Sequence, residues 1–129
     1  MKNYGLTKPL AGEFEAVRDR TEAALKQEGF GILTVVDIGE TLRSKLGVSV
    51  GRYLILGACH PPSAYKAIQA DKSIGLFLPC NVILYEQDSA TTVVSMFDPV
   101  SVAGEGGNRE LLEAAKYVRD KFQAILASL

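Results

Sequence analysis

The chain has 129 residues, of which 47% are hydrophobic and 22% are charged, values typical of an ordinary globular protein and not of a disordered one. Its 14 Lys and Arg residues nearly balance its 15 Asp and Glu residues, so it lacks the positive field that attracts a nucleic acid backbone. The length fits one domain, and we expect residues 1–129 to fold as a single unit around one core.

The sequence shows no sign of export or of membrane insertion. No apolar run reaches the roughly 18 to 20 residues that span a bilayer, and the first eight residues lack the apolar stretch of a secretory signal. We therefore expect a cytoplasmic protein that binds neither membranes nor nucleic acid. In that compartment the only two cysteines, Cys59 and Cys80, are expected to be reduced thiols rather than a structural disulfide.

The N-terminal part predicts a strand followed by an amphipathic helix. Residues 4–9 favour a strand that ends at Pro9 and Gly12. In residues 13–27 a stripe of apolar side chains, completed by one threonine, recurs at helical spacing, and Gly29 follows as a stop signal. The stripe consists of Phe14, Val17, Thr21, Ala24 and Leu25.

A second strand, a short helix and a third strand follow. Residues 30–36 are apolar and β-branched, which favours a strand. Asp37 is placed to cap a helix over residues 38–46, and Gly47 is placed to end it. Residues 53–58 are almost entirely apolar, which is typical of a strand that is covered on both faces or lies near the centre of a sheet.

The C-terminal half predicts a helix, a hairpin and a long final helix. Prolines at 61 and 62 suit the first turn of a helix over residues 61–70, and residues 71–78 are expected to be irregular. Strands over 80–85 and 91–97 flank the polar turn 86–89, the pattern of a hairpin. After a loop, Asn108 can cap a helix whose apolar stripe should lie on the sheet: Leu111, Leu112, Ala115, Val118, Phe122, Ile125 and Leu126. The order β-α-β-α-β-α-β-β-α predicts a two-layer α+β domain.

Both cysteines and the only histidine lie at strand ends. Cys59 and His60 follow the third strand, whereas Cys80 and Asn81 begin the fourth. If these two strands pair antiparallel, Cys59, His60 and Cys80 converge on one edge of the sheet. In an antiparallel meander the end of strand 91–97 returns to the same edge, so Asp98 becomes a possible polar neighbour.

Each of these residues also has a simpler interpretation. Cysteine is among the most buried residue types, so both thiols can be inert core residues. Alternatively, the free N–H groups at the start of helix 61–70 would favour a thiolate at Cys59. His60 is expected to be a solvated loop residue, and its spacing from Cys59 and Cys80 matches no usual zinc site. Asp98, followed by a proline, is typical of a turn.

Several segments together resemble the bacterial and archaeal family known as domain of unknown function 302. They are residues 29–34, residues 56–62 with the pattern Cys-His-Pro-Pro, residues 67–71, residues 75–82 with the pattern Leu-Pro-Cys-Asn, and the pair 98–99. The resemblance covers nearly the whole chain. It implies a fold similar to the TATA-binding-protein-like class, with helices on a curved, mainly antiparallel sheet, and a homodimer. It implies no established activity, and the cofactor, if there is one, is unknown.

Three hypotheses about function follow. The first is a homodimer that binds a small molecule or a soft metal at a pocket edge formed by Cys59, His60, Cys80, Asn81 and Asp98, with the two thiols as candidate metal ligands. The second is a thiol-based redox protein or enzyme in which Cys59 and Cys80 cycle between thiols and a disulfide. The third is an interaction protein with buried, unreactive thiols. DNA binding does not follow from the shared fold, because function resides in a site and this chain lacks a basic surface.

Overall fold

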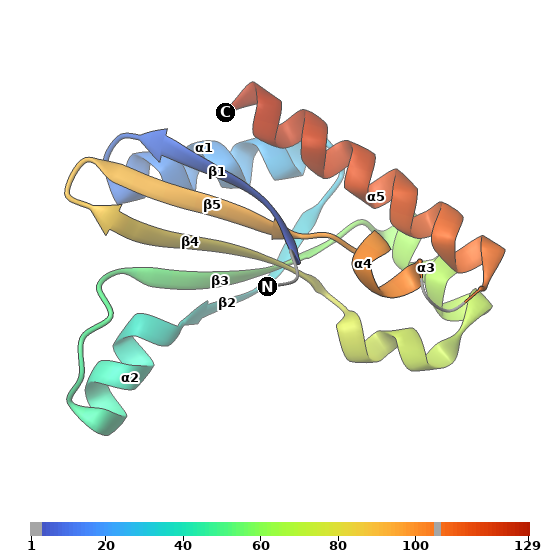
Figure 1. The fold of residues 1–129 in the computed structure, drawn as a ribbon, viewed down its shortest axis with the longest axis horizontal. Helices are drawn as coiled ribbons and strands as arrows, with labels where there is room; N and C mark the ends of the chain where they lie inside the picture. The colour runs from blue at the N-terminus through green and yellow to red at the C-terminus, as the bar shows by residue number, and fades with distance from the viewer. Residues whose placement is uncertain (1–3, 105–106) are drawn as a thin grey trace.

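A computed structural model describes residues 4–104 and 107–129 and contains one five-stranded sheet (Figure 1). The spatial order of the strands is β1-β5-β4-β3-β2, and every neighbouring pair is antiparallel. The strands are β1 (Gly5–Ala11), β2 (Gly31–Asp37), β3 (Tyr53–Cys59), β4 (Cys80–Asp88) and β5 (Thr91–Phe97). The predicted two-layer α+β fold is therefore confirmed, with the sheet fully antiparallel.

The helices lie on one face of the sheet and around its two ends. They are α1 (Phe14–Gln27), α2 (Ile38–Leu46), α3 (Pro61–Ala70), the 3-10 helix η1 (Lys72–Phe77), α4 (Val100–Ala103) and α5 (Arg109–Ser128). Figure 1 shows α1 and α5 side by side over the sheet, with α3, α4 and η1 gathered at one end and α2 beyond the opposite end. The predicted helices are thus present. The sequence missed the short helix α4, and residues 72–77, which were expected to be irregular, form η1.

The main core lies between one face of the sheet and helices α1 and α5. Alternate positions of the central strands point toward the helices, as the two-residue period of a strand requires. The side chains of α1 and α5 that pack against these strand residues recur every three or four residues, as the sequence pattern predicts. The fully buried members with the largest side chains are Phe30, Phe122, Leu25, Leu54, Leu56, Leu84 and Met96.

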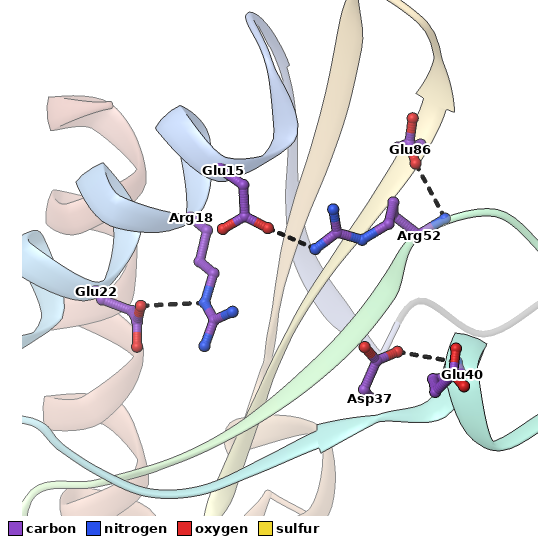
Figure 2. Close-up of polar contacts among 7 residues, drawn as sticks. All are labelled: Glu15, Arg18, Glu22, Asp37, Glu40, Arg52 and Glu86. Atoms are coloured by element: carbon purple, nitrogen blue, oxygen red, sulfur yellow. Dashed lines mark hydrogen bonds and ion pairs between the residues drawn. The ribbon is translucent and has the colours of Figure 1, made fainter.

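Polar contacts hold the start of β3 against α1 and β4 (Figure 2). The Arg52 backbone N–H donates to Glu86 Oε1 at 3.1 Å, and the Arg52 guanidinium donates to Glu15 Oε1. The same guanidinium lies 4.3 Å above the centroid of the Phe14 ring. In the same region Asp37 accepts from the backbone N–H of Glu40 at 2.9 Å, so the predicted cap of α2 is confirmed.

The boundaries of several elements differ from the expected ones by one to three residues. Strand β1 continues past Pro9 to Ala11, because it pairs along its whole length with β5. Strand β4 runs on to Asp88 through an irregularity in its pairing with β5, which shortens the expected turn. Leu112 is only partly buried, and the N-terminal half of α5 packs against α3 and α4 instead of the sheet.

The described chain contains no helix with both the length and the apolar character needed to cross a membrane.

Candidate functional site

A small apolar cavity lies where the ends of β3 and β4 meet α3 and α5. The volume that the centre of a water-sized sphere can occupy in it is about 50 Å³, and its lining is predominantly apolar. Ala58, Cys59 and Cys80 come from the strand ends, and His60 stands at the start of α3. The helical walls are lined by Ala64, Ala67, Ala103, Leu111, Ala114, Ala115 and Val118.

The cavity exists because small side chains face it from three helices. Alanines on α3, α4 and α5 let these helices approach one another closely, as helix spacing depends on the side chains at the contact. They form a second apolar cluster beside the main core, which contains Ala67, Ala103, Leu111 and Ala115. Where this cluster meets the main core near Phe30 and Cys80, the short side chains do not fill the space.

The register of β3 and β4 brings the two cysteines to this cavity. Ala58 is the partner of Cys80, so Cys59 lies one position beyond the pair. Both thiols line the cavity, and both are free. Cys80 is buried and Cys59 is half-buried. The convergence predicted from antiparallel pairing of these strands is therefore present in the structure.

Burial makes both thiols harder to ionise. Burial, followed by repulsion from Cys59, raises the pKa of Cys80 from 9.0 to about 11. Burial also raises the pKa of Cys59. The expectation that the N-terminus of α3 would favour a thiolate at Cys59 is therefore wrong, because desolvation of the charge outweighs it. Since the thiolate is the reactive form, neither sulfur is activated as a nucleophile.

His60 is the N-cap of α3 rather than the expected solvated loop residue. Its Nδ1 accepts a hydrogen bond from the Ser63 backbone N–H at 3.3 Å and lies 2.8 Å from Ser63 Oγ. The ring lies between Phe30 and Tyr117, with centroids at 5.4 and 5.3 Å. Gly29 leaves room for it, because a Cβ at that position would approach His60 Cδ2 to 3.3 Å.

The surroundings of His60 favour its neutral form. Burial, followed by the nearby positive charge of Lys121, lowers the pKa of the imidazole. A ring nitrogen that accepts a backbone N–H carries no proton, so Nε2 holds the proton of the neutral ring. His60 is therefore a fixed, uncharged wall of the cavity at neutral pH.

Asn81 and Asp98 lie outside the cavity. Asn81 follows Cys80 on β4 and is exposed, since consecutive strand residues point to opposite faces. Asp98 Oδ1 accepts from the Val100 backbone N–H at 3.0 Å, and its Oδ2 lies 3.6 Å from Arg119 Nε. The structure thus brings Cys59, His60 and Cys80 together and places Asn81 and Asp98 elsewhere.

The donor atoms at the cavity do not form a metal-binding set. Among residues 4–104 and 107–129, no three side chains of the His, Cys, Asp and Glu types are grouped so that they could hold a metal ion. Cys59 and Cys80 would have to lose protons that burial retains, and His60 Nδ1 is engaged with Ser63.

A second, wider hollow lies on the surface between α3 and α5. It is a groove of about 690 Å³ by the same measure, and charged side chains line it together with apolar ones. His60, Ser63 and Ala114 line both the groove and the cavity. The remaining side chains of the groove are Pro62, Lys66, Gln69, Glu110, Glu113 and Tyr117. Sequence reasoning missed these residues, although the alanines of helix 61–70 indicate a close helix neighbour.

Comparison with known proteins supports the family resemblance. The family model described as "Domain of unknown function DUF302" matches residues 6–129. No functionally curated protein matches the chain. The crystal structure of an uncharacterized conserved DUF302 protein from Bacillus stearothermophilus superposes with a TM-score of 0.88 at 28% sequence identity, over 98% of each chain. The chain therefore belongs to the DUF302 family, a domain of unknown function.

Proposed function

We propose that this protein binds a small, largely apolar molecule in the cavity at the ends of β3 and β4. One observation carries the proposal: a pocket with a predominantly apolar lining is left open where the ends of β3 and β4 meet the helices. Protein interiors are normally close-packed, and each unfilled space forfeits dispersion contacts with its lining atoms. An apolar ligand would restore those contacts, whereas water would find few hydrogen-bond partners there.

The thiols and the imidazole take a supporting role in this proposal. Cys59 and Cys80 supply polarizable walls, and His60 closes one side as a neutral ring. A soft-metal site draws less support, because the donors are protonated or engaged. A thiol redox pair also draws less support, because both pKa values are raised and the sulfurs are unbonded.

Xenon binding followed by NMR tests the proposal, because xenon is an apolar probe that enters dry cavities. We expect xenon to shift the methyl resonances of residues that line the cavity, such as Ala67 and Ala115. Ala115→Leu should fill the space and abolish these shifts, whereas Ala124→Leu at an exposed position of the same helix should not. Ala67→Val fills the cavity from α3 if Ala115→Leu fails to fold. Absence of xenon shifts in the wild-type protein would refute the proposal.

We also infer that the protein associates with a second copy of itself, and a separate observation favours this. Helices α1 and α5 cover one face of the sheet, while the other face carries apolar side chains such as Ile55, Ile83 and the stacked pair Tyr53 and Tyr85. Within α2, all of whose residues are described, Gly39 is the only buried one. A nine-residue helix is marginal in water unless an apolar stripe is packed.

The exposed apolar surface approaches the area that a dimer needs. Six large apolar side chains on β2, α2 and the following loop are about half exposed: Leu33, Val35, Val36, Leu46, Val48 and Val50. Burying them would remove on the order of 300 Å² of apolar surface from water. A stable interface buries about 800 Å² per partner, of which about 500 Å² is apolar. The open sheet face and the apolar stripe of α2 would supply the rest.

A symmetric dimer would cover both surfaces at once, with the α2 region of each copy against the open sheet face of the other. A formal net charge of -1 opposes this association only weakly. Sedimentation equilibrium should show a dimer at micromolar concentration. Val36→Lys combined with Leu46→Lys should give a folded monomer, whereas Ile68→Lys, on α3, should not. A monomeric wild-type protein would refute the inference.

A further inference from the structure

Side chains at the end of η1 and of β5 form one wall of the apolar cavity. Phe77, Leu78 and Phe97 line the cavity and also line a recess on the outer surface, which has a volume of about 200 Å³ by the same measure. The remaining side chains of this outer recess are Leu76, Pro79 and Asn81. On this side, the side chains that bound the cavity therefore also bound a surface recess.

The wall at η1 is more exposed than the wall at the groove. Phe77 is 46% exposed although it lines the cavity, and η1, all of whose residues are described, contains no buried residue. At the groove, by contrast, Ser63 and Ala114 line the cavity and are buried. Segments with few buried contacts are the parts of a protein that open most readily. The cavity is therefore expected to open at η1 and not at the groove.

The hydrogen bonds of η1 are local. The backbone N–H and the hydroxyl of Ser73 donate to Asp71 Oδ1 at 2.9 and 2.6 Å, and the Ile74 N–H donates to the Asp71 carbonyl at 3.1 Å. Among the described residues, no hydrogen bond of residues 72–77 reaches a strand or α5. A 3-10 helix also has poorer hydrogen-bond geometry than an α-helix. Thus η1 can move outward without breaking a hydrogen bond to the sheet.

The Phe77 ring closes this wall by stacking on Phe97. The two ring centroids are 6.4 Å apart and the ring planes differ by 1°. Phe97 is fixed by the pairing of β5 with β1, so Phe77 is the member of the stack that can move. Turning the Phe77 ring outward exposes only the half that is now buried. This cost corresponds to about a tenfold preference for the closed state.

We propose that Phe77 is the gate of the cavity and that ligands enter and leave between Phe77 and Phe97. The inference rests on the ligand-binding function proposed above and adds the route to that site. When the ring turns outward, the cavity of about 50 Å³ joins the outer recess of about 200 Å³. The joined space holds a longer apolar molecule than the closed cavity does.

Alkylation of Cys80 measures the opening of this wall, because the thiol lines the cavity and the probe is iodoacetamide itself. A Cys59→Ser background leaves Cys80 as the only thiol. We expect Phe77→Ala to accelerate the labelling of folded Cys80 by about tenfold, since no ring then closes the wall. Phe77→Leu should give a smaller acceleration, and it replaces Phe77→Ala if that variant does not fold. An acceleration below about twofold in both variants would overturn the proposal.

Tyr117→Ala is the matched control. Tyr117 is also an aromatic residue that is 46% exposed, but it lines the groove on the other side of the cavity. This variant should leave the labelling rate of Cys80 within about twofold of its value before the substitution. Equal acceleration by Tyr117→Ala and Phe77→Ala would overturn the proposal, because the cavity would then open at the groove as well.

Dilute urea distinguishes opening of the gate from unfolding of the whole protein. Urea promotes an opening in proportion to the surface that the opening exposes, so labelling through the gate should be nearly unchanged in about 1 M urea. A steep increase of the Phe77→Ala rate with urea would assign the acceleration to global unfolding and overturn the proposal.

Xenon separates failure of this inference from failure of the proposed function. Xenon shifts in the wild-type protein, together with unchanged Cys80 labelling in the Phe77 variants, would overturn the gate and leave the cavity as an apolar binding site. Accelerated labelling without xenon shifts would refute the ligand site and would still support Phe77 as the barrier in front of Cys80.

Discussion

The ionisation of Cys80 gives a quantitative test of the environment at the cavity. A pKa of about 11 instead of 9.0 lowers the thiolate fraction at pH 8 from about 10% to about 0.1%. Alkylation proceeds through the thiolate, so Cys80 should react about 100-fold more slowly than an unperturbed thiol, before any steric protection is added. Cys59 should react faster than Cys80, because it is less buried.

Iodoacetamide labelling followed by mass spectrometry of the peptides measures both rates. Cys59→Ser isolates Cys80, Cys80→Ala isolates Cys59, and labelling in guanidinium gives the rate of each thiol in the unfolded chain. The folded and unfolded rates of Cys80 should differ by about 100-fold or more. Labelling of folded Cys80 within about threefold of its unfolded rate would refute the assignment of this thiol to a buried, apolar environment.

The same shift predicts how stability depends on alkaline pH. The unfolded chain loses the Cys80 proton near pH 9, whereas the folded chain retains it until about pH 11. The stabilisation is therefore complete below pH 9 and is lost as pH rises toward 11, by about 2 to 3 kcal/mol in the free energy of unfolding. Urea denaturation from pH 8 to 11 should show this loss in wild type, and a smaller loss in Cys80→Ala. Equal slopes in the two proteins would contradict the linkage.

Three further predictions concern packing and the cap of α3. Gly57→Ala places a Cβ against Thr34 Oγ1 and the Pro79 ring and should cost about 1 to 3 kcal/mol in urea denaturation, whereas Gly75→Ala, with open space around it, should cost less than about 0.5 kcal/mol. Phe122→Ala should cost about 3 to 5 kcal/mol, because the ring is fully buried; a cost below about 1 kcal/mol would contradict this packing. The pKa of His60 is lower in the folded chain than in the unfolded chain, so the unfolded chain takes up the proton at a higher pH. The stabilisation that results from the neutral ring is therefore present above pH 6.5 and is lost as the pH falls below it. Urea midpoints at pH 7.5 and 5 should show this loss in wild type, and a smaller drop in His60→Gln, the variant at the only histidine; an equal drop would assign the effect to other groups.

The candidate site was only partly predictable from the sequence. The two Cys motifs flank strands that pair in sequence order, so their convergence follows from antiparallel pairing. The role of His60 did not follow, because its position between Phe30 and Tyr117 depends on α5, which is about 50 residues away in the chain. Asn81 follows Cys80 immediately, yet the two-residue period of β4 places it on the other face of the sheet.

The sequence by itself determined the types of the five strands and the longer helices and most of their buried faces, because both depend on local periodicity. The stripe of α5 and the cap residues Asp37 and Asn108 lie where the pattern predicts. Only the tertiary structure decided which elements meet. Residues 4–104 and 107–129 leave one face of the apolar strand β3 without a covering helix, and a cavity opens where alanines from α3, α4 and α5 come together. Contacts of this kind depend on how separate elements pack, and no local spacing encodes the volume that their side chains leave empty.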